Sequence, residues 1–501
     1  MTQIRKKSIV VTVYIYIGFA IGALNTLLFA NKLYFTQSEY GLTRAMIDVA
    51  IMCSAFAAVG VPMYIIKFFP YYNKRLTKQH NDLLGRAILI TIIGLVIVII
   101  ASIIAQPLVI RKYSGNAPLL VTYFYYTIPI TIGYVLYTLL DTYAWNYGLQ
   151  VYTNVLKEVV VRLIVLILIL LYLTNVITLH AFFILFSLQY LVVCVILIIK
   201  LNSIGAMAIQ LKQSIVSIKF NKQIRSLMLF GFAGSLVGAI KVALDSIILS
   251  SIKGLAYAAV YTFVGFAASL LQAPFRSMVS VTFPLLVTAW QQKNKAEIQR
   301  LYQRSSINLL LFSIFIFGII VLNFEHAIYL FHLNENYLTG KNLLYILCIA
   351  YIIDLGTGLN GQIIQASTAW RFEFYTNVLL AAILIPFTYY FTVWYGLIGP
   401  AIATLIGITV YNIIRIVYLY TKYQFFPFTT KSLWVLITFT ALILACTYTN
   451  QWLTMWPSLI VTNVLYCTLA MVLVYTLKLS PDVQPVLNTI ATRLGLKLKI
   501  K

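Results

Sequence analysis

The sequence predicts an all-α, polytopic integral membrane protein with 14 transmembrane helices. Of its 501 residues, 61% are hydrophobic and only 10% are charged, and the mean hydropathy is +0.92. Ordinary soluble domains carry roughly 25% charged residues, so this chain needs lipid as its solvent for most of its length. Its apolar residues also gather in runs of about 20, the length that crosses a hydrocarbon core about 30 Å thick.

These apolar runs give the expected helices in chain order. The first run follows a basic segment, as in a signal peptide, but it is too long for one and lacks a convincing cleavage site, so we interpret it as a retained helix. A basic segment, 201–226, separates the sixth span from the seventh. The predicted spans are 9–31, 41–67, 83–106, 118–143, 155–175, 179–200, 227–252, 256–288, 304–323, 340–366, 371–391, 396–420, 431–449 and 456–477.

The distribution of Lys and Arg predicts the orientation of these spans. With the N-terminus inside, the cytoplasmic segments hold 25 of the 36 Lys and Arg residues and the external loops hold five. Basic flanks are retained on the cytoplasmic side, so both termini are predicted to be cytoplasmic. Topology therefore explains the net charge of +24 without a nucleic-acid partner. The C-terminal tail, 479–501, is expected to lie near anionic lipid.

Reporter fusions test this topology. We expect fusions after residues 80, 212, 295 and 485 to report a cytoplasmic location, and fusions near residues 115 and 335 to report an external one. The physical reason is the excess of Lys and Arg in the first group of segments. An external C-terminus would contradict the even number of spans.

Sequence landmarks recur in the two halves of the chain. The string "YTNVL" occurs at 152–156 and again at 375–379, "GFA" occurs at 18–20 and 231–233, and Asp141 corresponds to Asp354. Each pair occupies the same helix of its half. Each half contains six predicted helices. Because six is an even number, both halves run in the same direction through the membrane. A binding cavity is then expected between two lobes that rock about it. The predicted parts are an N-lobe at 1–200, a cytoplasmic linker at 201–226, a C-lobe at 227–422, helices 13 and 14 at 423–478, and the tail.

Two segments carry a resemblance to a known family. These are "NKLYFTQSEYGL" at the entry to the second span and "WYGLIGPAIATLIGITVYNIIRIVYLY" around the twelfth. They resemble the polysaccharide-export branch of the multidrug/oligosaccharidyl-lipid/polysaccharide exporter superfamily. The most specific pattern is G-x-x-G-x-A-x-A-T, whose small residues allow close helix approach. It is formed here by Gly396, Gly399, Ala401, Ala403 and Thr404, with Pro400 in place of a commoner alanine.

The resemblance implies a flippase that moves a polyprenyl-diphosphate-linked oligosaccharide repeat unit across the bacterial inner membrane by alternating access. The implied cargo is an O-antigen, capsule or exopolysaccharide precursor. The resemblance implies no cofactor, a monomer in the lipid bilayer, and the polymerase and glycosyltransferases of the same pathway as partners. Three alternatives stay open: a lipid II flippase, a multidrug exporter of the same fold, and a membrane polymerase or glycosyltransferase.

Charged residues inside the predicted spans are the candidates for function, because charge in a bilayer is costly and rare. The candidate substrate-binding cations are Arg276, Lys241, Arg44 and Lys67. Arg276 has no acidic residue within four positions, and its planar guanidinium suits phosphate oxygens. The alternative is that its helix ends early and the side chain reaches the headgroups. The same snorkelling is expected of Lys67, Arg162 and Arg415 near cytoplasmic helix ends. Arg162 also follows Glu158 by four residues, a spacing that predicts a local pair on one helix face.

Acidic residues in the spans are candidates for ion coupling. Asp48 and Asp245 each follow a cation by four residues, a spacing that equally predicts a local ion pair with Arg44 or Lys241. Asp141 and Asp354 share a repeat position and are candidates for proton exchange, because burial shifts the proton affinity of a carboxylate. Hydrogen bonding to polar neighbours such as Asn146 or Asn360 is the alternative for these two.

The sequence offers little support for catalysis or metal binding. The longest external loop holds only Glu325 and Glu335, and the whole chain has 12 acidic residues, so we predict no catalytic residues. The five cysteines are isolated within apolar runs, and His326 and His332 are expected in a solvated loop. We therefore predict no metal site. The basic set of intramembrane charges also disfavours a cavity for cationic drugs.

Overall fold

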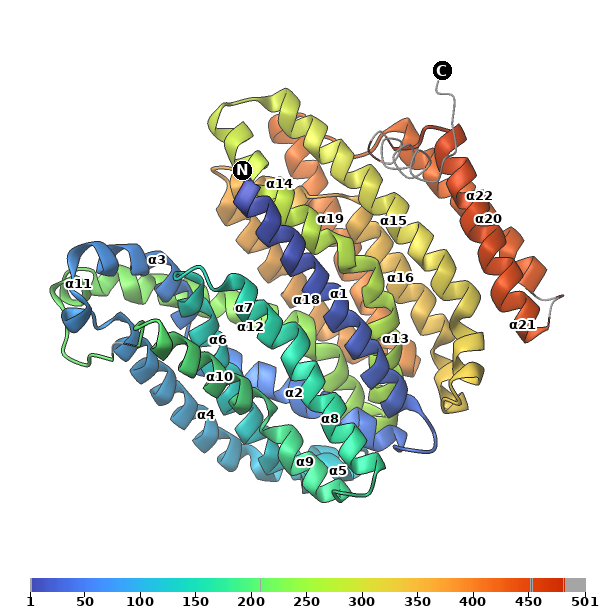
Figure 1. Cartoon of the computed structure of the whole chain (residues 1–501). Coiled ribbons are helices and arrows are strands. Elements are labelled where there is room, and N and C mark those ends of the chain that lie inside the picture. The colour runs from blue at the N-terminus through green and yellow to red at the C-terminus, as the bar shows by residue number, and fades with distance from the viewer. Residues whose placement is uncertain (1, 208, 451, 453, 481, 483–501) are drawn as a thin grey trace. The chain divides into compact units, whose positions relative to one another are not determined.

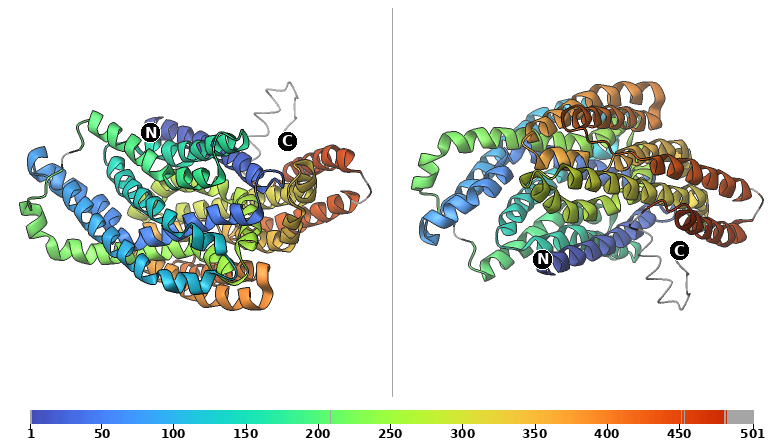
Figure 2. Two further views of the ribbon diagram at one scale, coloured as in Figure 1. Left: turned by 90° about the horizontal axis from the view of Figure 1, so that it is seen from below. Right: turned by 90° about the horizontal axis from the view of Figure 1, so that it is seen from above.

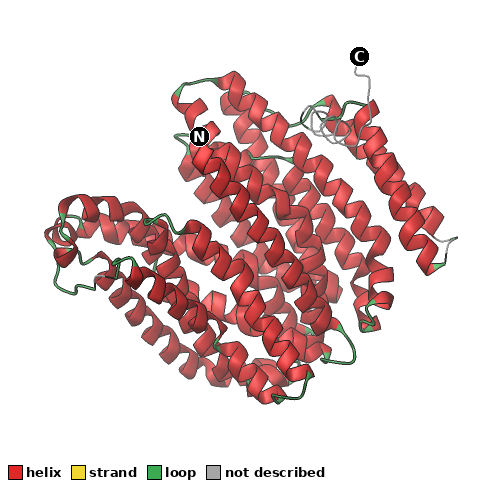
Figure 3. Ribbon diagram, viewed as in Figure 1, coloured by secondary structure: helices red, strands yellow, loops and turns green. Residues whose placement is uncertain are grey.

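The computed structural model describes residues 2–480 apart from 208, 451 and 453, and also describes residue 482. These residues form helices joined by short turns and loops (Figures 1 and 3), which confirms the predicted all-α class. Most of the predicted basic tail, 479–501, lies outside the described residues.

Eleven stretches of the described chain are helical, long and apolar enough to cross a membrane. One of them, Arg371–Tyr423, contains two helices, so these stretches account for twelve of the predicted spans. The other two predicted spans, 118–143 and 155–175, fall on helices that short 3-10 or π segments interrupt. The fourteen predicted spans are therefore consistent with the structure, although not all of them are continuous helices.

The described chain divides into two compact units. The first comprises residues 1–263 and 385–400, and the second comprises 264–384 and 401–501. The predicted lobes at 1–200 and 227–422 stay a prediction. The helices of the first unit are α1 (Thr2–Ala30), α2 (Gln37–Ala57), α3 (Val61–Arg75), α4 (Leu83–Tyr113), α5 (Pro118–Thr122), α6 (Thr127–Trp145), α7 (Gln150–Val155), α8 (Val161–Leu173), α9 (Leu179–Ser187), α10 (Gln189–Ser203), α11 (Ile215–Lys219), α12 (Asn221–Ile252) and most of α13 (Leu255–Ser269).

Local sequence explains how α2 begins and where it ends. Thr36 and Glu39 form a capping box, in which the backbone N–H of Glu39 donates to Thr36 Oγ1 and the N–H of Thr36 donates to Glu39 Oε2. The predicted span 41–67 is divided, because α2 ends at Ala57 and α3 begins four residues later with Pro62 in its first turn. Within the first unit, α2 packs against α6 and α12.

Asp82 holds part of the predicted linker, 201–226, against its neighbours in the first unit. Its buried carboxylate accepts hydrogen bonds from Ser217 Oγ at 2.5 Å and from the backbone N–H of Ser214 at 3.2 Å. Ser217 also bonds to the hydroxyl of Tyr72 at 2.6 Å. A segment predicted as a plain linker is thus attached to α3 and to the start of α4 by buried polar contacts.

The second unit has its own helices and core. Buried side chains of α14, α15, α17 and α19 form one hydrophobic cluster, and those of α15, α20 and α22 form another. In both views of Figure 2, α20 and α22 run side by side in red. The helices are α14 (Ala273–Gln291), α15 (Lys295–Leu330), α16 (Lys341–Gly356), α17 (Asn360–Ala366), most of α18 (Trp370–Tyr395) and α19 (Gly399–Tyr423), α20 (Thr430–Asn450), α21 (Met455–Pro457) and α22 (Asn463–Thr476).

The predicted span 340–366 is also divided, and the break creates a polar site. Gly358 separates α16 from α17 with φ +70°, a conformation that side chains with a Cβ rarely adopt. A Cβ there would also press on Ser305 Oγ at 2.8 Å and on the backbone of Ser306. The chain therefore turns within the helix bundle and presents Thr357 and Asn360 to α19.

Candidate functional site

Polar side chains from α16, α17 and α19 meet inside the second unit. Asn412 is 1% exposed and donates from Nδ2 to Asp354 Oδ1 at 2.9 Å. Its own Oδ1 accepts hydrogen bonds from Asn360 Nδ2 at 2.6 Å and from Thr357 Oγ1 at 2.8 Å. The expectation that Asp354 bonds to polar neighbours is confirmed, with Asn412 as the direct partner and Asn360 one step further on.

Arg415 joins this network and does not snorkel to the headgroups, so that expectation is wrong for this residue. Its side chain is 6% exposed and forms an ion pair with Glu373, which is 19% exposed. The guanidinium also donates to Asn360 Oδ1 at 3.3 Å and lies over the ring of Tyr411, 3.6 Å from the ring centroid. The physical reason is that α18 supplies a buried carboxylate across the helix interface, 42 residues away in the chain.

The second copy of the repeated string lies in the same network. Thr376 Oγ1 accepts a hydrogen bond from Arg415 Nε at 3.4 Å. Asn377 donates to Glu373 Oε1 at 3.0 Å and accepts from the hydroxyl of Tyr411 at 3.1 Å. The repeat "YTNVL" thus supplies polar groups to a buried site.

The first copy contributes to a smaller cluster in the first unit. Trp145 Nε1 donates to Asp141 Oδ1 at 2.6 Å and to Thr153 Oγ1 at 3.2 Å. The expected hydrogen bonding of Asp141 is confirmed, with Trp145 as partner, whereas Asn146 bonds to backbone carbonyls. In each unit the Thr of the repeated string therefore takes part in a polar cluster, which is buried in the second unit and partly exposed in the first.

A second group of charges lies where α2 packs against α12. Arg44 Nε is 2.8 Å from Asp48 Oδ2, which confirms the predicted pair, and the Asp48 side chain is fully buried. Arg44 also donates to the carbonyl of Val242 at 3.3 Å, next to Lys241 in the chain. Asp245 accepts from the hydroxyl of Tyr261 at 2.5 Å and from Thr388 at 3.4 Å. The structure thus brings the Arg44–Asp48 pair of α2 to the segment of α12 that carries Lys241 and Asp245.

The remaining candidate cations lie on exposed helix faces. Lys67 on α3 and Lys241 on α12 have exposed side chains. Arg276 is also exposed, and it lies in α14, after a 3-10 turn at Leu270–Gln272 that interrupts the predicted span 256–288. It is the last residue of the stretch Leu255–Arg276 that is apolar enough to cross a membrane. Arg162 pairs with Glu158 at 3.1 Å, as its spacing predicted.

Two residues of the buried network, Glu373 and Asn412, are missing from the sequence-based set of site residues. Glu373 lies two residues before the second "YTNVL", and Asn412 lies three residues before Arg415. A repeated string beside an acidic residue within an apolar run is the signal that could have marked Glu373. No such signal marks Asn412, because its partners come from other helices.

Comparison with known proteins identifies the fold. No protein-family model and no curated protein sequence matches the chain. A solved structure of the lipid II flippase MurJ, in an inward closed conformation, is similar over 93% of this chain and 98% of its own, with a TM-score of 0.72 and 16% identity. An inward-facing multidrug resistance MATE family transporter of the MOP superfamily is similar over 83% of this chain and 98% of its own, with a TM-score of 0.63 and 15% identity.

A third similar structure is a MOP superfamily transporter from Pyrococcus furiosus. It covers 84% of this chain and 96% of its own, with a TM-score of 0.58 and 13% identity. At these identities the similarity shows the fold alone. The chain therefore has the MOP, or MATE-like, fold that the sequence predicted, and its function is argued from its residues.

Proposed function

We propose that the protein is a transporter that flips a polyprenyl-diphosphate-linked oligosaccharide repeat unit across the inner membrane by alternating access. The observation that carries this proposal is that each unit has an exposed cation, Lys241 in the first and Arg276 in the second, within a stretch that is apolar enough to span a membrane. A diphosphate supplies the negative charge and the oxygen acceptors that such side chains bind. Arg44 and Lys67 complete the proposed set of phosphate-binding cations.

The proposed cargo belongs to surface polysaccharide synthesis: an O-antigen, capsule or exopolysaccharide precursor. A lipid II flippase is the second candidate, because the similar structure with 93% coverage of this chain is named as one. Both cargoes carry a diphosphate on a polyprenyl chain, so both need the same cations. A drug exporter needs acidic partners for its cationic substrates. Here six of the 36 Lys and Arg residues fall in neither the cytoplasmic nor the external segments and are predicted to be intramembrane.

The four acidic candidates are proposed to couple an ion to this movement. The network around Asp354 contains two carboxylates, Asp354 and Glu373, and one guanidinium, Arg415. Its three charged members therefore sum to one negative charge in a largely buried place, which favours binding of a monovalent cation. Asp141, Asp48 and Asp245 are the corresponding candidates in the first unit.

Deleting the protein tests the proposed function. With the upstream glycosyltransferases intact, the deletion strain is expected to accumulate lipid-linked repeat units on the cytoplasmic leaflet and to lose the surface polymer, because a polar glycan does not cross lipid unaided. The measurement is mass spectrometry of extracted lipid-linked glycans. Normal surface polymer in the deletion strain, or accumulation of lipid II with lysis, would overturn the polysaccharide cargo.

A further inference from the structure

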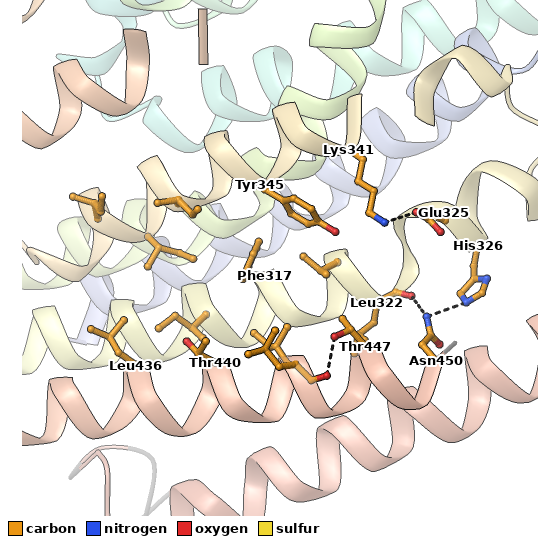
Figure 4. Close-up of a pocket in the computed structure, with 17 residues that line it drawn as sticks. Phe317, Leu322, Glu325, His326, Lys341, Tyr345, Leu436, Thr440, Thr447 and Asn450 are labelled. Carbon is orange, nitrogen blue, oxygen red and sulfur yellow. Dashed lines mark hydrogen bonds and ion pairs between the residues drawn. The ribbon is translucent and has the colours of Figure 1, made fainter. Parts of the chain in front are cut away.

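A cavity of about 880 Å³ lies between α15, α16 and α20 in the second unit. Ten of its seventeen lining side chains are aliphatic or Phe. Figure 4 shows that the charged groups Glu325 and Lys341 gather with His326 at one end, where α15 ends and α16 begins. The cavity is therefore amphipathic along its length, with a charged mouth and an apolar interior.

The length of the apolar part fits one hydrocarbon chain. Lining residues of α16 run from Lys341 to Ile353, which at about 1.5 Å per residue corresponds to about 18 Å. One leaflet is about half of a hydrocarbon core that is about 30 Å thick. A chain that starts at the mouth would thus reach the middle of the membrane inside the cavity.

The mouth holds charges of both signs that remain accessible. Lys341 Nζ is 2.5 Å from Glu325 Oε1, and the two side chains are 43% and 49% exposed. An ammonium has three donors and a carboxylate about four acceptor positions, so each keeps capacity for a ligand. His326 lies beside them, with Nε2 3.3 Å from Asn450 Nδ2. An exposed ion pair contributes only about 0–1 kcal/mol to stability, so folding alone gives little reason for it.

We propose that this cavity binds a zwitterionic glycerophospholipid whose headgroup ends in a primary ammonium. One acyl chain fills the apolar part, the phosphate contacts Lys341, and the ammonium donates to Glu325. Charge complementarity selects this headgroup. An anionic headgroup would bring a second negative charge to Glu325 without a cation for it, and a quaternary ammonium has no N–H to donate. The inference does not depend on which cargo the protein transports.

Filling the cavity with a larger side chain tests the proposed position of the acyl chain. The full-length protein is purified in mild detergent, and its bound lipids are measured by native mass spectrometry. Leu444→Trp, on the lining face of α20, is expected to lower the occupancy of bound phosphatidylethanolamine at least fivefold. Ile437→Trp is the matched control, because Ile437 is exposed on the same helix but does not line the cavity. Equal occupancy in the two variants would overturn the site.

The proposed headgroup selectivity is tested in nanodiscs that contain equal amounts of phosphatidylethanolamine, phosphatidylglycerol and phosphatidylcholine. The wild type is expected to retain phosphatidylethanolamine roughly tenfold over the other two, as the loss of one charge-assisted hydrogen bond implies. Glu325→Gln should abolish this preference and keep the total lipid bound. Equal retention of all three lipids by the wild type would contradict the proposal, and so would retention of a polyprenyl lipid in place of any phospholipid.

Discussion

Arg276→Ala is expected to lower transport by roughly tenfold or more. If the guanidinium contacts a diphosphate, the substitution removes charge-assisted hydrogen bonds worth about 1.5–3 kcal/mol, and each 1.4 kcal/mol corresponds to about a factor of ten. The measurement is surface polymer in a deletion strain complemented with each variant at matched protein level. Matched abundance matters because a charge needed only for folding would reduce the amount of protein as well.

Arg276→Lys separates the two interpretations of this residue. A diphosphate contact predicts partial recovery, because an ammonium keeps the charge but loses the two-pronged geometry of the guanidinium. Snorkelling from the end of the apolar stretch Leu255–Arg276 predicts nearly full recovery, because lysine snorkels equally well. Normal export by a stably expressed Arg276→Ala protein would exclude the diphosphate role.

Arg415→Met is expected to destabilise the protein by about 3–5 kcal/mol, because it leaves the Glu373 carboxylate buried without its cation. The measurement is the midpoint of thermal unfolding in detergent. Arg300→Met is the control within the same chain. The Arg300 side chain is 60% exposed and pairs with Glu297 one turn away, and such exposed pairs contribute only about 0.3–0.5 kcal/mol.

The double variant Arg415→Met with Glu373→Gln distinguishes a stability role from a role in transport. Removing both charges should restore most of the unfolding midpoint, since a buried pair can be replaced by neutral groups at little cost. Lost transport in this folded double variant would support ion coupling by the network. A midpoint for Arg415→Met no lower than that of Arg300→Met would contradict the burial of the pair.

Features that depend on neighbours in the chain were predictable from the sequence. The apolar runs predicted the helices and the fold, and the i, i+4 spacing predicted the pairs Arg44 with Asp48 and Arg162 with Glu158. The repeated string identified two segments that both carry polar contacts. For the helices and the two ion pairs, the interacting groups lie within one apolar run or about one helix turn apart.

Features that depend on distant segments were not predictable in this way. Arg415 and Glu373 are far apart in the sequence, so the spacing of charges could not show that they pair, and proximity to a helix end suggested snorkelling instead. His326 was expected in a solvated loop because the chain nearby is polar, yet it lies in α15 and contacts Asn450 of α20. The 3-10 turn at Leu270–Gln272 likewise falls inside a long apolar run, whose hydropathy carries no sign of it.

The most direct measurement of the central claim is cargo movement in liposomes that contain only the purified protein. Polyprenyl-diphosphate oligosaccharide placed in one leaflet is expected to become accessible to a glycan-cleaving enzyme on the other side. The rate should depend on the protein and fall roughly tenfold with Arg276→Ala. No protein-dependent movement of this lipid, together with uptake of a lipophilic cation or with lengthening of the glycan, would contradict the account.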